Sequence, residues 1–212
     1  LKFYGDYSDY SGHGNNGTPV NGPSLAAGKL GNALQFTTAL GTVPAVTNFV
    51  TLGYPTDLKF TDTTPFTIAF WVKLTQQSDD LALVGNTQWD SSGNRGWGIF
   101  CQGGGNFRIK STSGAGGGAN RTDVTYSNVI RDGNWHHLVV VFEQGQAIYT
   151  TLDGVQLAPR IWTATTTGSV DTDDIGYVRN ISGTDYPGTH AINIGQEGTG
   201  WKKLGFVVVD EQ

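Results

Sequence analysis

Cysteine is almost absent from this sequence. Cys101 is the one cysteine among 212 residues, so no disulfide can form within the chain. Cysteine usage therefore does not indicate whether the protein resides in an oxidising or a reducing compartment. It follows the apolar residues Ile99 and Phe100, and no second cysteine could bind a metal with it. We therefore expect a buried structural cysteine rather than a reactive one.

Long hydrophobic runs are missing as well. No apolar stretch reaches the roughly 18 residues that a membrane-spanning helix needs, so no membrane insertion is expected. The opening residues, LKFYGDYSDY, lack the basic and apolar regions of a signal peptide. Both ends of the chain, LKFY and LGFVVVDEQ, are strand-like, which indicates a module of a larger polypeptide with further domains.

Charge is sparse and evenly spread. Charged residues make up 15% of the chain, and three of them are glutamates, Glu143, Glu197 and Glu211. The formal net charge is −5 and the 13 basic residues form no cluster, so no nucleic acid partner is expected. With few glutamates and 31 glycines, the chain also has little helix-forming material.

What the sequence does contain is short β-branched and aromatic runs separated by Gly, Asn, Asp and Ser, the pattern of an antiparallel β protein. Asp153-Gly154 is a two-residue hairpin turn, because both positions need a positive φ that Asp and Gly tolerate. The runs predict strands at 33–36, 49–52, 66–74, 81–86, 96–101, 106–111, 134–142, 147–152, 155–157, 192–194 and 204–209.

Two of these runs, FTIAFWVKL and NWHHLVVVF, are apolar on both faces, as in strands at the middle of a covered sheet. The sequence therefore predicts an all-β fold, an antiparallel β-sandwich or jelly roll of two stacked sheets. The polar tracts at 114–120 and 163–174 are predicted to be loops. Because no linker divides the chain, residues 1–212 are expected to form a single domain.

Several segments, taken in order, resemble the laminin-G-like domains of the concanavalin A-like jelly-roll superfamily. They are DYSGHGNNGT, GKLGNALQF, FTIAFWVK, DGNWHHLVVVFEQGQAIYTTLDGVQL, INIGQ and LGFVVVDEQ. The resemblance covers almost the whole chain and implies the sandwich fold. It is less specific for function, because this scaffold carries lectins, hydrolases and adhesive domains.

The resemblance also implies a structural calcium ion between the N-terminal segment and the last strand. Hard oxygen ligands from Asp, Asn and backbone carbonyls suit Ca²⁺, which takes six to eight of them. The alternative is that Asp9 caps its own turn while Asp210 makes a surface ion pair. The residues at the matching positions are Asp6, Asp9, Asn15, Asn16 and Asp210.

His136 and His137 are adjacent in a predicted strand, so their side chains point to opposite faces of the sheet. They cannot ligate one metal or act as a pair. Each is expected to be a packed imidazole, hydrogen-bonded to a neighbouring strand or turn.

Catalysis is not expected. Retaining glycoside hydrolases of the superfamily carry Glu-x-Asp-x-Glu in one strand, because nucleophile and acid stand about 5 Å apart, and that pattern is absent. Nor does the chain contain a Gly-x-Ser-x-Gly elbow, a His-x-x-x-His zinc pair or a phosphate loop.

Sugar-binding sites combine an aromatic ring with polar groups. The ring packs on the apolar face of the sugar, and the polar groups pair with its hydroxyl groups. Two predicted loops have this mixture, with Trp89 and Tyr186 as stacking residues. Trp71, Trp135 and Trp97 are expected in the core. The candidate ligand-binding residues are Trp89, Asp90, Asn94, Arg95, Arg179, Asn180, Asp185 and Tyr186.

These observations favour a non-catalytic binding module, carbohydrate-binding or adhesive, of a secreted or surface-exposed protein. The alternative is a structural or adhesive domain of a virion, filament or cell surface that binds protein rather than glycan. The third and least favoured hypothesis is a glycoside hydrolase. The expected location is extracellular in each case.

Overall fold

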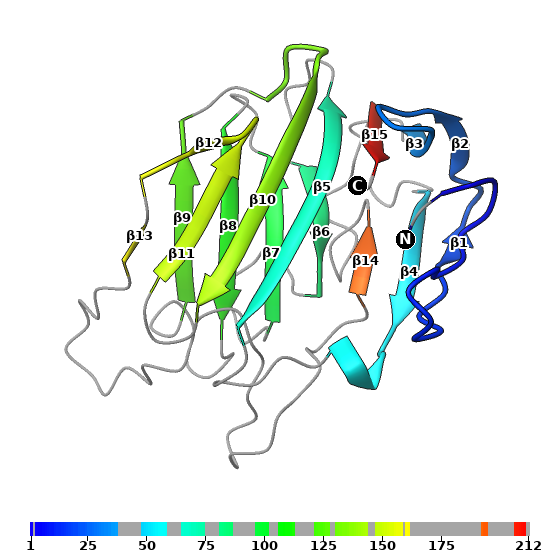
Figure 1. Cartoon of the computed structure of the whole chain (residues 1–212), viewed down its shortest axis with the longest axis horizontal. Coiled ribbons are helices and arrows are strands. Elements are labelled where there is room, and N and C mark those ends of the chain that lie inside the picture. The colour runs from blue at the N-terminus through cyan, green and yellow to red at the C-terminus, as the bar shows by residue number, and fades with distance from the viewer. Residues whose placement is uncertain are drawn as a thin grey trace.

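The computed structural model is a sandwich of two antiparallel sheets (Figure 1). Apart from one 3-10 turn, η1 (Thr56–Leu58), the described elements are strands, and no described helix could span a membrane. The predicted loops at 114–120 and 163–174 lie outside the described part. The structure describes residues 1, 3–37, 48–58, 65–74, 81–86, 96–101, 106–112, 121–127, 130–143, 147–158, 160–161, 192–194 and 206–210.

The first sheet has seven strands in the order β1-β4-β14-β6-β7-β8-β9. β14, late in the sequence, lies inside this sheet and pairs with both β4 and β6. The strands are β1 (Thr18–Val20), β4 (Phe49–Gly53), β14 (Ile192–Ile194), β6 (Leu81–Gly85), β7 (Gly96–Cys101), β8 (Phe107–Thr112) and β9 (Arg121–Tyr126).

The second sheet has eight strands in the order β12-β11-β10-β5-β15-β3-β2, with β13 pairing to β11. β15 lies inside it and pairs with both β3 and β5. The strands are β12 (Val155–Gln156), β11 (Ala147–Leu152), β10 (Trp135–Glu143), β5 (Phe66–Leu74), β15 (Phe206–Asp210), β3 (Asn32–Thr37), β2 (Ser24–Ala27) and β13 (Arg160–Ile161).

The two-sheet fold and each of the eleven predicted strands are confirmed, with ends shifted by one or two residues. The four strands that the sequence did not predict, β1, β2, β9 and β13, are short or polar. β9, for example, reads RTDVTY and has one aliphatic residue, Val124. Such strands form because a neighbour supplies their hydrogen bonds, as β8 does for β9 over six register pairs.

The core fills the space between the sheets. β10 contributes alternate residues, so Leu138, Val140 and Phe142 are fully buried. Phe142 stacks on Phe66 of β5, with ring centroids 4.4 Å apart, and both rings contact Trp97 of the opposite sheet at 6.2 Å and 5.6 Å. This aromatic cluster joins the two layers.

β5 and β10 lie in the middle of the second sheet, as their doubly apolar sequences predicted, and they pair with each other. The expectation that Trp71 and Trp135 are core residues was wrong. They alternate with the buried residues of β5 and β10, so they lie on the outer face of the sheet and are partly buried. An apolar run on both faces does not reveal which face meets the second sheet.

Trp97 and Cys101 are core residues, as predicted, with exposed fractions of 2% and 0%. The buried guanidinium of Arg131 donates from Nε to Cys101 Sγ at 3.0 Å and from an Nη atom to the Cys101 carbonyl at 2.9 Å. Cys101 therefore has a structural role that also satisfies a buried cation.

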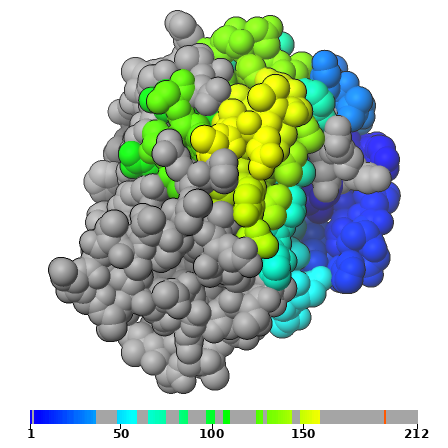
Figure 2. Space-filling model, turned by 60° about the vertical axis from the view of Figure 1, so that its left-hand side comes forward, coloured from blue at the N-terminus to red at the C-terminus, as the bar shows by residue number. Residues whose placement is uncertain are grey.

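The Asp153-Gly154 turn is confirmed. Its φ angles of 52° and 79° are the positive values that a two-residue hairpin requires. The turn joins β11 to β12, and β10 pairs with the other edge of β11. The N-terminal segment lies at the opposite flank of the molecule from β11 and β12 (Figure 1). In Figure 2 the segment is at the right-hand edge, while β11 and β12 face the viewer.

Candidate functional site

The N-terminal segment folds into a turn that is closed by Asp9. The Asp9 carboxylate accepts the N–H groups of Ser11 and Asn15, each at 2.9 Å, and the Asp9 N–H donates to Asn16 Oδ1 at 2.8 Å. Hydrogen bonds from Ser11, and then from Asn15, lower the pKa of Asp9 to about 2. Asp9 therefore caps its own turn. This is one half of the alternative to calcium, and the other half concerns the Asp210 side chain, which lies outside the described residues.

Next to this turn, Asp6 contacts Tyr10, which is one of two exposed tyrosines that contact each other. Asp6 Oδ1 accepts the Ser8 N–H at 3.0 Å, and the Tyr10 hydroxyl lies 3.2 Å from both carboxylate oxygens. The Ser8 N–H, more than any other group, lowers the pKa of Asp6. Tyr10 contacts Tyr4 edge to face, with ring centroids 5.1 Å apart and an interplanar angle of 70°.

Asp57 of η1 connects the turn to the body of the domain. Asn15 Nδ2 donates to Asp57 Oδ2 at 2.8 Å, and His13 Nδ1 lies 3.3 Å from the same oxygen. On the other side, Gly17 N–H donates to the Tyr7 carbonyl at 2.7 Å. The segment is thus anchored at several points along its length.

The structure brings four of the five predicted calcium ligands, Asp6, Asp9, Asn15 and Asn16, into this one segment. Asp210 lies in β15 opposite Trp71, and its side chain falls outside the described residues. The donor chemistry fits Ca²⁺, because ionised carboxylate oxygens keep lone pairs beyond those used by N–H groups. No group of three or more His, Cys, Asp or Glu side chains converges within the described residues, so calcium binding stays a prediction.

His136 lies between two carboxylates. Its Nδ1 is 2.8 Å from Asp153 Oδ2 and its Nε2 is 3.0 Å from Asp132 Oδ1, while its side chain is 12% exposed. Burial lowers the pKa of His136, but the hydrogen bonds and charges of Asp153 and Asp132 outweigh it, and the net change is upward. Carboxylates only accept, so the imidazolium form satisfies both contacts.

Both aspartates also accept hydrogen bonds from other residues. Asp153 Oδ1 accepts the His137 N–H at 2.8 Å, and Asp132 accepts the backbone and side-chain N–H groups of Asn134 at 2.8 and 2.9 Å. The Asn134 side chain, its N–H and then His136 keep the pKa of Asp132 well below its usual range. His136 therefore joins the start of β10 to the β11–β12 hairpin, confirming the packed, hydrogen-bonded imidazole predicted for it.

His137 differs from that prediction. It points to the outer face of the second sheet and packs against its register partner Trp71, with ring centroids 4.9 Å apart. His137 Nε2 and Trp71 Nε1 are buried atoms without a hydrogen-bond partner in the described structure. Lys29 Nζ lies 5.3 Å from the Trp71 ring centroid, as in a cation–π contact.

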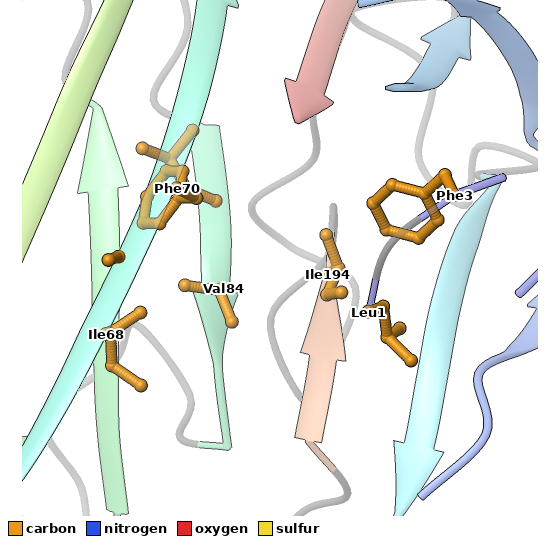
Figure 3. Close-up of a pocket in the computed structure, with 8 residues that line it drawn as sticks. Leu1, Phe3, Ile68, Phe70, Val84 and Ile194 are labelled. Carbon is orange, nitrogen blue, oxygen red and sulfur yellow. The ribbon is translucent and has the colours of Figure 1, made fainter. Parts of the chain in front are cut away.

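An apolar pocket of about 130 Å³ lies between β5 of one sheet and β6 and β14 of the other (Figure 3). Leu1 and Phe3 of the N-terminal segment line its far side. The described residues that line it are apolar, so they offer no polar side chain that would orient a hydroxyl-rich ligand. The lining residues are Leu1, Phe3, Ile68, Ala69, Phe70, Leu83, Val84 and Ile194.

The predicted ligand-binding residues fall outside the described part of the chain, so the structure neither gathers them nor separates them. They are Trp89, Asp90, Asn94 and Arg95 in one predicted loop and Arg179, Asn180, Asp185 and Tyr186 in the other. Sequence reasoning missed the exposed pair Tyr4 and Tyr10. The opening FYGDYSDY is rich in tyrosine, but it does not indicate which of the rings are exposed.

Comparison with known families gives one match. A laminin G family model, described as the concanavalin A-like lectin/glucanases superfamily, matches residues 45–190. No curated protein matches the sequence.

Solved structures with the same fold include toxin binding domains. The binding domain of Paraclostridial Mosquitocidal Protein 1 has a TM-score of 0.66 and 15% identity over 96% of this chain and 44% of its own. The binding domain of botulinum neurotoxin DC in complex with SialylT gives 0.56 and 10%, over 95% and 42%. In complex with rat synaptotagmin II it gives 0.57 and 11%, over 97% and 46%. This chain therefore spans less than half of each, and the likeness concerns the fold.

Proposed function

Because the chain belongs to the concanavalin A-like lectin/glucanases superfamily, we propose that it is a non-catalytic, carbohydrate-binding module of a secreted or surface-exposed protein. The family match is the observation that carries the proposal. The sandwich fold agrees with it, because solved binding domains share this fold. One of those neighbours was solved in complex with SialylT, so the fold is compatible with a glycan ligand.

Four of the described carboxylates have structural roles, which is consistent with a binding module. Asp9 caps a turn, Asp132 and Asp153 hold His136, and Asp57 anchors Asn15. Each accepts hydrogen bonds from the protein itself. A glycosidase instead needs a free acid and a free nucleophile on either side of the substrate bond.

The proposal predicts retention on immobilised glycans that depends on the loop aromatics. Replacing Trp89 or Tyr186 with alanine removes a stacking ring, and we expect about tenfold weaker binding, measured by retention on a glycan array and by calorimetry. Tyr54→Ala, which removes an exposed tyrosine outside both loops, is the matched control and should bind normally. Absence of retention on every glycan would refute the proposal.

A protein ligand is the second candidate function. It is favoured by the neighbour that was solved in complex with rat synaptotagmin II. In that case the chain is a structural or adhesive domain of a virion, filament or cell surface. Failure to bind glycans, together with saturable binding to cells treated with glycosidases, would favour this candidate.

We also propose that calcium rigidifies the N-terminal turn through Asp9, together with Asn15 or Asn16. At a concentration 100-fold above Kd, a bound ion adds about 2.7 kcal/mol to the free energy of unfolding. The expected rise in Tm, from EDTA to calcium, is roughly 5–10 °C by calorimetry. Asp9→Asn should abolish the rise, and magnesium should not reproduce it. Identical Tm values in calcium and in EDTA would count against the metal.

A further inference from the structure

Tyr4 and Tyr10 form an aromatic platform on the surface of the N-terminal segment. Their exposed fractions, 64% and 51%, are among the highest of the large hydrophobic residues in the described structure. Isolated exposed tyrosines are common, but these two contact each other edge to face. The contact leaves most of both rings open to solvent in a single place.

The platform is held in position before any ligand arrives. The Tyr10 hydroxyl is bound to Asp6, and the Asp6 carboxylate is bound to the Ser8 N–H. The next turn is closed by Asp9 and tied to η1 through Asn15. A ring that is already fixed loses little conformational entropy on binding, so more of the contact energy appears as affinity.

The charges around the platform select the kind of ligand. The charged side chains that the described hydrogen bonds place in this segment are Asp6, Asp9 and Asp57, with His13 beside Asp57. Ionised carboxylates accept strong hydrogen bonds from hydroxyl groups and repel anionic groups.

We propose that the Tyr4–Tyr10 platform is a binding site for a neutral sugar residue, in addition to the site predicted around Trp89 and Tyr186. The apolar face of the pyranose packs on the tyrosine rings, and its hydroxyl groups donate to the Asp6 carboxylate. The inference rests on the proposed carbohydrate-binding function. It adds a second site and a preference for uncharged over sialylated or sulfated glycans.

The test uses the whole chain and a panel of neutral oligosaccharides with glucose, galactose, mannose or N-acetylhexosamine ends. Sialylated and sulfated versions of the same oligosaccharides provide the charge comparison. Calorimetry is carried out on Tyr4→Ala and Tyr10→Ala, with Tyr10→Phe to keep the ring and remove the hydroxyl contact with Asp6. The matched control is Tyr149→Ala, on β11 at the opposite flank of the molecule. Thermal unfolding shows whether each variant is folded.

We expect Tyr4→Ala and Tyr10→Ala to weaken binding of a neutral oligosaccharide about tenfold, while Tyr149→Ala has no effect. Tyr10→Phe should fall between Tyr10→Ala and the unchanged chain. If Trp89→Ala abolishes binding and the two alanine variants do not weaken it, the platform inference fails and the proposed function stands. A preference for sialylated or sulfated glycans also overturns the inference, and no binding to any glycan overturns both proposals.

Discussion

Replacing Phe142 with alanine is expected to lower the free energy of unfolding by about 4 kcal/mol. The Phe142 ring is fully buried, stacks on Phe66 at 4.4 Å and contacts Trp97 of the other sheet at 6.2 Å. Truncation therefore removes a large apolar group, leaves a cavity between two rigid sheets and ends an aromatic contact that joins the layers.

Urea unfolding at equilibrium measures this effect. Val155→Ala is the matched control, because Val155 is 65% exposed on β12 and its truncation should change stability by less than about 0.5 kcal/mol. A double-mutant cycle with Phe66→Ala should give a coupling of about 1 kcal/mol from the stacked pair. Equal losses for Phe142→Ala and Val155→Ala would show that the cluster does not stabilise the sandwich.

Replacing His136 with alanine is expected to lower the free energy of unfolding by about 2 kcal/mol at pH 6. The imidazole is 12% exposed and lies between Asp153 and Asp132, so its loss leaves two carboxylates facing one another without the cation. The aspartates are 43% and 40% exposed, and solvent screens their charges, which places the loss below that of a fully buried pair.

The pH dependence of this effect has a definite sign. Because the pKa of His136 is raised in the folded state, its stabilisation is fully present below the unfolded value of about 6.5. It is lost as the pH rises through the higher folded value. Between pH 6 and pH 9 the free energy of unfolding of the unchanged chain should therefore fall toward that of His136→Ala. The two curves of this free energy against pH should converge at high pH.

The control for His136 is His13→Ala. His13 is 67% exposed and lies 3.3 Å from Asp57, so its removal should cost less than about 0.5 kcal/mol at any pH. The measurement is the urea midpoint of each variant across the pH range. Parallel curves for the unchanged chain and His136→Ala would mean that the imidazole does not bridge the two aspartates in solution.

The sequence allowed the layers, the strands and the hairpin to be predicted, because these depend on local patterns. The Asp153-Gly154 turn defines the register of the β11–β12 hairpin, in which Leu152 pairs with Val155. The neighbouring β10–β11 ladder pairs Leu138 with Leu152, which places Asp153 beside His137 and near His136. That register is known from the structure, so the sequence did not identify the carboxylate that holds His136.

Other features could not be derived in this way. Trp71 and Phe70 are neighbours in one apolar run, and whether one or the other faces the core depends on where the opposite sheet stacks. The link between Asn15 and Asp57 joins residues 42 positions apart through a turn and η1, neither of which has a periodic pattern. The exposure of Tyr4 and Tyr10 likewise depends on the tertiary placement of the segment.

The positions of β14 and β15 have a consequence for how the chain folds during synthesis. In the described sheets β14 alone connects β4 to β6, and β15 alone connects β3 to β5. A nascent chain that has left the ribosome only as far as β13 therefore holds each layer as two separate pieces with unpaired strand edges. Within the described strands, both layers close only once β14 and β15 have emerged, so unpaired edges that could aggregate stay exposed until then.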